Sequence, residues 1–122
     1  MRVLIVRPME RPETVELDES LETLQKAVGG YIECVYPWED SAALICNEEG
    51  KINGLALNRA VREGDAVTDI IAGTFIVAGL DGDGFGSLTE SQIERYSRMF
   101  KDPEIFFRIP GSGIKAVRIE IA

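Results

Sequence analysis

Residues 31–79 read YIECVYPWEDSAALICNEEGKINGLALNRAVREGDAVTDIIAGTFIVAG, and this stretch decides the fold of the chain. Apolar runs near its two ends, at 31–36, 42–46 and 69–78, have the length and composition of β-strands. A polar block at 47–59, rich in asparagine, glutamate and glycine, lies between them. A buried polar group without a hydrogen-bond partner costs about 1–3 kcal/mol. The block therefore forms either structural turns or a ligand site.

The first of these runs alternates between two faces of a strand. The alternation puts Tyr31 and Glu33 on one face and Tyr36 on the other. A carboxylate in mid-strand belongs to an edge or a solvent face, or it lines a polar pocket beside the tyrosines. Residues 42–46 are expected to form a second strand, adjacent and antiparallel to the first.

The polar block carries strong turn signals. Residues 47–50 predict a hairpin turn, after which a return strand is expected to begin at Lys51. Asn53 and Gly54 predict a second turn. Residues 79–86, rich in glycine and aspartate, are expected to form a loop.

The second half of the stretch predicts two further elements. Residues 55–61 are expected to form a short strand that ends in one helical turn, with Asn58 and Arg59 at the junction. Ligand contacts are often made at such junctions. Residues 69–78 predict one buried strand, with a bulge or a close approach at 73–74.

Two helices are predicted outside the strands. Apolar residues at helical spacing mark the first at 17–28, with Asp18 as the expected N-cap and Gly29 as the stop. Thr89 and Gln92 form a capping box at the start of the second. Its inner face is expected to carry Ile93, Tyr96, Met99 and Phe100.

The expected fold is a single α+β domain over residues 1–122. Strands at 3–6 and 114–121 complete an antiparallel or mixed sheet of about five strands, packed by two helices. At 122 residues and 45% hydrophobic composition, the chain is large enough to bury one core.

Composition excludes several classes of function. The net charge of −8 and the pI near 4.5 argue against direct binding of nucleic acid or anionic membrane. The chain has no histidine, which removes His-based nucleophilic catalysis and histidine zinc sites. Its two cysteines, Cys34 and Cys46, lie in apolar runs and indicate a reduced, cytoplasmic protein. No run is long enough to cross a membrane.

Candidate sites for metal or catalysis are weak. Residues 81–88 resemble the start of an EF-hand loop, but Phe85 stands at position 5 and Gln92 at position 12, so the bidentate carboxylate is missing. Four carboxylates are candidates for convergence in an acid–base site: Glu33, Glu48, Glu49 and Asp69. Nothing in their spacing is specific to catalysis. We therefore expect no catalytic residue, no metal and no cofactor.

Segments 29–33, 43–54, 57–59 and 69–75, with the later segments 85–89 and 96–107, resemble an uncharacterised family, domain of unknown function 3846. The resemblance implies an accessory protein of phages and mobile elements, with a role in countering host defence. One departure is Ala56, where the family usually has proline. The family pattern emphasises the polar residues Glu33, Asn47, Glu48, Asn53, Asn58, Arg59 and Thr74.

These observations lead to a functional hypothesis. We expect a non-enzymatic binder of a small polar ligand, such as a nucleotide immune signal, which it sequesters. Arg59 would face a phosphate, asparagine amides would read a base or sugar, and a tyrosine would stack. The expected ligand-binding residues are Tyr31, Glu33, Tyr36, Asn47, Glu48, Asn53, Asn58, Arg59 and Thr74.

Two alternatives remain open, and the oligomeric state is a further expectation. The protein could instead be an acidic inhibitor of a host defence protein that mimics DNA, although its acids are interspersed with bases. A small hydrolase is disfavoured by the missing histidines. Because sites in small sequestering proteins often form between two copies, we expect a homo-oligomer.

Overall fold

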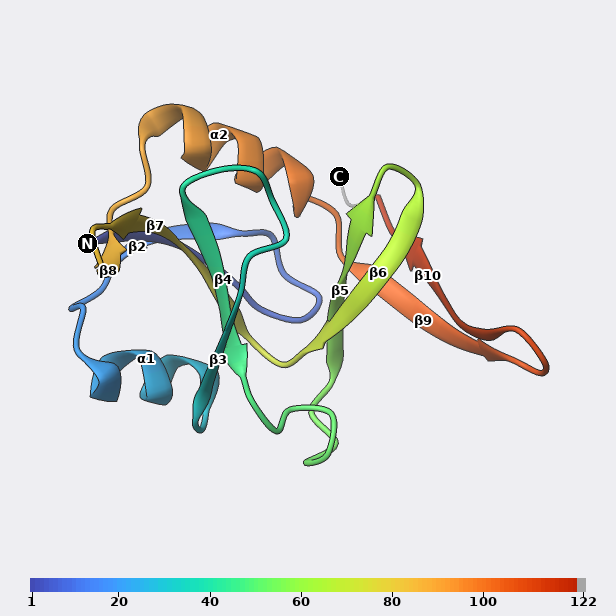
Figure 1. Ribbon diagram of the computed structural model, residues 1–122. Helices are drawn as coiled ribbons and strands as arrows, with labels where there is room; N and C mark the ends of the chain where they lie inside the picture. The colour runs from blue at the N-terminus through green and yellow to red at the C-terminus, as the bar shows by residue number, and fades with distance from the viewer. Residues whose placement is uncertain (121–122) are drawn as a thin grey trace.

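The computed structural model describes residues 1–120, and its centre is an antiparallel sheet of six strands (Figure 1). From one edge to the other the main path is β2 (Glu13–Glu16), β1 (Arg2–Val6), β7 (Phe75–Asp81), β4 (Ala42–Asn47) and β3 (Ile32–Val35). β8 (Gly84–Gly86) also pairs with β7. The expected strands at 3–6, 31–36 and 42–46 are confirmed, and β3 and β4 are adjacent and antiparallel as predicted.

The core lies on both faces of this sheet because its central strands are continuous apolar runs. Alternate residues of β1 point to opposite faces: Leu4 packs with Tyr96 and Phe100, whereas Val3 packs with Leu24 and Val28. The helix α2 (Glu90–Met99) therefore covers one face and α1 (Leu21–Val28) covers the other.

Both helices have the caps that their sequences require, with one difference. α1 begins after Ser20, whose hydroxyl accepts a bond from the Thr23 amide, so the prediction of Asp18 as N-cap was wrong. Gly29 ends α1 with φ of 82°, as expected for a left-handed C-cap. The capping box of α2 is confirmed.

Two hairpins outside the main sheet correct the expectation of a single five-stranded sheet. β5 (Leu57–Glu63) pairs with β6 (Ala66–Ala72), and β9 (Glu104–Ile109) pairs with β10 (Gly113–Arg118). The fold is mainly β, with two helices and only antiparallel pairing among residues 1–120.

The segment 69–78 is not one strand. It is divided between β6 and β7, which belong to different sheets, and the chain turns at Gly73 with φ of 80°. A Cβ atom at Gly73 would lie 2.8 Å from Leu55 Cδ1, so the expected close approach is real. The residues on both sides of the bend are apolar because the end of β6 and the start of β7 are both buried in the core.

Several local predictions also need correction. No strand begins at Lys51, since 48–54 consists of turns, and 57–63 is strand with no helical turn. The expected loop 79–86 is instead largely the β7–β8 hairpin. β2 and β9 were missed, and β10 was predicted at 114–121, of which residue 121 lies outside the described residues. No helix among residues 1–120 could span a membrane.

Candidate functional site

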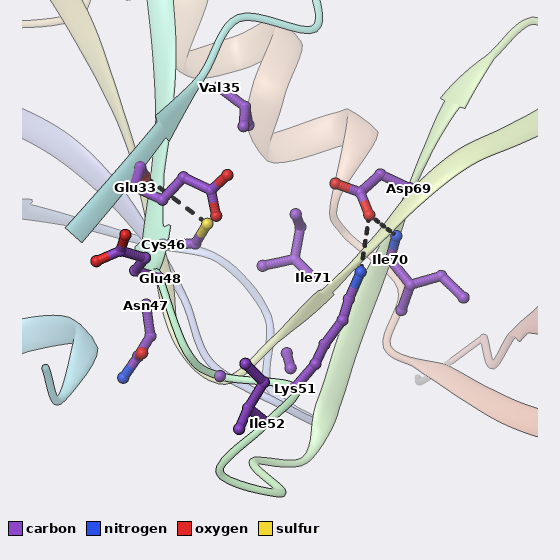
Figure 2. Close-up of a pocket in the computed structure, with 12 residues that line it drawn as sticks. Glu33, Val35, Cys46, Asn47, Glu48, Lys51, Ile52, Asp69, Ile70 and Ile71 are labelled. Atoms are coloured by element: carbon purple, nitrogen blue, oxygen red, sulfur yellow. Dashed lines mark hydrogen bonds and ion pairs between the residues drawn. The ribbon is translucent and has the colours of Figure 1, made fainter. Parts of the chain in front are cut away.

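A cleft of about 220 Å³ lies between the β3–β4 pair and β6 (Figure 2). One wall comes from β3 and β4, the other from β6, and the loop 48–54 crosses one end. The lining residues are Glu33, Val35, Cys46, Asn47, Glu48, Gly50, Lys51, Ile52, Asp69, Ile70, Ile71 and Ala72. The cleft therefore joins an apolar floor to a charged rim.

Strand alternation positions the first wall. Glu33 and Val35 face the cleft together, as two residues of one strand face must. Asn47, at the end of β4, is 7% exposed, and its side chain forms hydrogen bonds with backbone groups of neighbouring segments. Its Nδ2 donates to the Val28 carbonyl at 3.2 Å, and its Oδ1 accepts from the Glu49 amide at 2.8 Å. Asn47 thus supports the cleft wall.

The loop at the end of the cleft is held against β6. The Leu55 amide donates to the Gly50 carbonyl at 2.9 Å, and the Asn53 amide donates to the Glu49 carbonyl at 2.8 Å. Gly50 is buried, and a Cβ atom there would lie 2.8 Å from the Ala72 carbonyl oxygen. Only glycine lets the loop approach β6 this closely.

The rim of the cleft is acidic. Glu33, Glu48 and Asp69 contribute three carboxylates, and Lys51 contributes the single cation. Lys51 Nζ lies 2.9 Å from Asp69 Oδ1, whereas Glu33 and Glu48 form no ion pair within residues 1–120. Burial, together with a smaller contribution from the nearby Glu33, raises the pKa of the Cys46 thiol to about 11, so Cys46 stays neutral.

The structure brings together three of the nine predicted ligand residues. Glu33, Asn47 and Glu48 line the cleft, although Asn47 is used internally. Asn53 is exposed in the loop and does not line the cleft. Thr74 borders a separate shallow pocket beside Gly29.

Tyr31 and Tyr36 flank the strand that forms the first wall. They are 69% and 61% exposed, and neither lines the cleft. They stand at the two ends of β3, on the surface of the molecule.

Asn58 and Arg59 are buried, at 1% and 0% exposure, and bond to the protein itself. The Asn58 amide nitrogen donates to the carbonyls of Val6 and Gly73 at 2.9 and 2.8 Å. Arg59 donates to the Phe100 carbonyl through two nitrogens, at 3.0 and 3.2 Å. These contacts give both residues structural partners.

Other residues of the cleft, among them Lys51, Ile70 and Ile71, were not on the list of expected ligand residues. Asp69 was a candidate only for convergence with Glu33, Glu48 and Glu49; the structure brings Glu33, Glu48 and Asp69 to one rim, and Glu49 does not line the cleft. No group of three side chains that could hold a metal ion occurs in residues 1–120. Residues 70 and 71 carried no polar signal that could have marked them as lining a site.

The fold and the cleft together define a small α+β protein with an acidic surface cleft over an apolar floor. The chain belongs to the family described as domain of unknown function (DUF3846), whose model matches residues 1–101. No similar protein was found among curated proteins or solved structures. The matched segment includes the cleft and ends before the β9–β10 hairpin.

Proposed function

We propose that this protein is a non-enzymatic binding protein whose cleft holds a positively charged group of its ligand. The observation that carries the proposal is the imbalance of charge at the rim, where Glu33, Glu48 and Asp69 face a single Lys51. An amine or guanidinium group would donate hydrogen bonds to Glu33 and Glu48 while its alkyl part packs on the apolar floor.

The structure changes the ligand chemistry that the sequence suggested. Arg59, the residue expected to face a phosphate, is fully buried and bonded to backbone carbonyls. A phosphate in the cleft would instead face Glu33 and Glu48, with only Lys51 to oppose the repulsion. A cationic group is therefore favoured over the phosphate end of a nucleotide.

The size of the cleft limits what it accepts. Its volume of about 220 Å³ is below the roughly 300–1,000 Å³ typical of sites for drug-sized ligands. It therefore accommodates a small amine or one basic group of a larger ligand. In the setting that the family resemblance suggests, a protein of a mobile element would sequester such a ligand from the host.

The alternative of a DNA-mimicking inhibitor gains no support from the surface charges. Around the N-terminal strands, Glu13 pairs with Arg7 at 2.7 Å, and Glu90 pairs with Arg2. Glu16 lies 3.8 Å from the terminal amine. These pairs neutralise acids around the N-terminal strands, whereas a mimic of a phosphate backbone requires a continuous row of carboxylates.

Calorimetric titration tests the proposal with agmatine, spermidine and arginine amide, and with adenosine monophosphate as the anionic comparison. We expect the cationic probes to bind and the nucleotide to bind more weakly or not at all. Glu33→Gln and Glu48→Gln should each weaken binding by at least about tenfold, since a hydrogen bond to a charged group contributes about 1.5–3 kcal/mol. Glu19→Gln, an exposed change outside the cleft, is the matched control. Binding of the nucleotide alone would contradict the proposal.

A further inference from the structure

The β9–β10 hairpin, residues 104–118, extends from the body as an arm (Figure 1). Five of its large apolar side chains are 37–49% exposed: Ile105, Phe107, Ile109, Ile114 and Val117. The arm also carries Arg108, Lys115 and Arg118 against one acid, Glu104. The protein as a whole has a net charge of −8, so the arm is a basic, apolar element on an acidic body.

The two faces of the arm differ. Glu104 faces inward, is 4% exposed, accepts a bond from the Ala60 amide at 3.1 Å and pairs with Arg62 at 2.6 Å. Directly opposed residues of an antiparallel pair share a face. Because Lys115 opposes Phe107, these two residues lie together on the outer face of the arm.

The outer face of the arm also carries the opposed pair Ile105 and Val117. On this face β10 therefore presents the Lys115 ammonium group next to the apolar side chain of Val117. An acidic cleft with an apolar floor has the complementary chemistry.

The strand β3 forms one edge of the main sheet and pairs only with β4 within residues 1–120. The Glu48 amide donates to the Tyr31 carbonyl at 2.8 Å. Backbone groups of successive residues in an antiparallel strand point alternately to the two sides. The groups of 31, 33 and 35 therefore point toward β4, and those of Ile32 and Cys34 point to the open edge.

β10 has a matching open edge. The Ile119 amide donates to the Pro103 carbonyl at 2.7 Å, which fixes the alternation along the hairpin. The backbone groups of 115 and 117 point toward β9, and those of Ile114, Ala116 and Arg118 point away. Within residues 1–120, β10 pairs only with β9, so this side of the strand is available.

We propose that β10 of a second copy of this chain adds antiparallel to β3. Pairing of the open-edge groups allows the register in which Ala116 of the second copy lies opposite Ile32. The same register sets Lys115 opposite Glu33 and Val117 opposite Tyr31. It therefore makes a charge pair and a pair between an aromatic and a β-branched residue, both of which stabilise antiparallel strands. When each copy places its β10 on β3 of the other, the contact is made twice and the two copies close into a symmetric dimer.

This inference rests on the proposed function, because it names Lys115 of a second copy as a cation that the acidic cleft receives. Charge complementarity selects a second copy as the occupant, since the chain carries both the basic arm and the acidic cleft. The added strand also covers the open β3 edge, which otherwise presents unpaired backbone groups.

Sedimentation velocity of the full chain at several concentrations tests the proposal. We expect a dimer for the native protein, and a dissociation constant at least about tenfold weaker for Glu33→Lys and for Lys115→Glu. An equimolar mixture of these two variants should form heterodimers, because both exchanged pairs are then of opposite charge. Lys101→Glu, an exposed change at the end of α2, is the control and should leave the dimer intact.

Carbodiimide coupling of a mixture of ¹⁴N- and ¹⁵N-labelled protein provides the second measurement. Mass spectrometry should find a crosslink between Glu33 and Lys115 that joins light and heavy chains. A monomeric native protein, or a dimer indifferent to both charge reversals, would overturn the proposal.

The failure of this inference can be separated from the failure of the proposed function. Lys115→Glu removes the arm's cation and leaves the cleft unchanged, so agmatine is titrated into this variant. If the protein binds agmatine but never dimerises, the proposed cation-binding cleft stands and the proposed β10–β3 contact is wrong. If the dimer depends on the two charges but binds no small cation, the proposed β10–β3 contact stands and the proposed binding of a small ligand is wrong.

Discussion

Arg59 is the largest fully buried side chain among residues 1–120, and it joins three separate segments. Its guanidinium donates to the Phe100 carbonyl after α2, to the Glu10 carbonyl at 2.5 Å and to Asn58 Oδ1 at 2.8 Å. Burial lowers the pKa of Arg59, and the nearby Glu104 opposes that shift, so the residue stays charged. A charged group in this position acts as a structural clamp.

Replacement of Arg59 by leucine tests the clamp. Arg59→Leu leaves buried carbonyls without donors, each at a cost of about 1–3 kcal/mol. We therefore expect a loss of at least about 3 kcal/mol in the free energy of unfolding, measured by urea denaturation. Arg98→Leu removes only an exposed pair with Glu94 and should cost less than about 1 kcal/mol. If Arg59→Leu leaves the stability unchanged but abolishes ligand binding, Arg59 binds the ligand and the structural-clamp interpretation is wrong.

At the scale of elements, the bend between β6 and β7 determines how the hairpins meet the main sheet. The Gly73 amide donates to the Ala56 carbonyl at 2.7 Å, and its own carbonyl accepts from Asn58 at 2.8 Å. The bend thus ends the β5–β6 hairpin and directs β7 into the core. The floor of the cleft, Ile70 to Ala72, lies immediately before it.

Gly73→Ala should destabilise the protein by more than an ordinary glycine substitution. The φ angle of 80° disfavours a side chain, and the new Cβ atom would meet Leu55 at 2.8 Å. We expect a loss of about 2–3 kcal/mol, because overpacking adds to the backbone strain. Gly64→Ala shares the positive φ angle, 61°, but has no atom within 4 Å, so it isolates the strain alone. Thermal denaturation should rank the two, and an equal loss would contradict the packing argument.

At the scale of the whole molecule, Asp40 connects the loop before β4 to the helix α2. Its carboxylate accepts from Tyr96 Oη at 2.5 Å, from Gln92 Nε2 at 3.2 Å and from Arg95 Nη1 at 3.2 Å. The hydrogen bond from Tyr96 is the main cause that holds the pKa of Asp40 below its ordinary value. The ring centroids of Trp38 and Tyr96 lie 4.4 Å apart, and this packing holds the Tyr96 hydroxyl in position to donate to Asp40.

The stability of the protein should depend on pH through Asp40. A lowered folded-state pKa contributes stability above the unfolded value of about 3.9, and that contribution is lost as pH falls through the folded value. Asp40→Asn should therefore cost about 1–2 kcal/mol at pH 7 and less at pH 2, measured by urea denaturation. Glu39→Gln, next to it and exposed, is the control. An equal cost at both pH values would exclude the linkage.

The sequence predicted elements whose signals are local. The apolar runs of β1 and β4, the alternation of β3 and the capping box of α2 depend on neighbouring residues, and the structure confirms each. Prediction from the sequence failed where two strands share one continuous apolar run. Residues 69–78 are apolar throughout, and local composition does not reveal that Gly73 sends the two halves into different sheets.

The features of the candidate site also divide into those that local sequence predicts and those that depend on distant segments. Strand alternation alone placed Glu33 on a face apart from Tyr36, and turn chemistry alone predicted the turns at 47–50 and 53–54. Only the tertiary structure decided that Asn58 and Arg59 turn inward, because their carbonyl partners at Val6, Glu10 and Phe100 are distant in the chain. It also decided that Asp69 reaches the rim beside Glu33, since hydrogen bonding and packing between distant segments set which side chains meet.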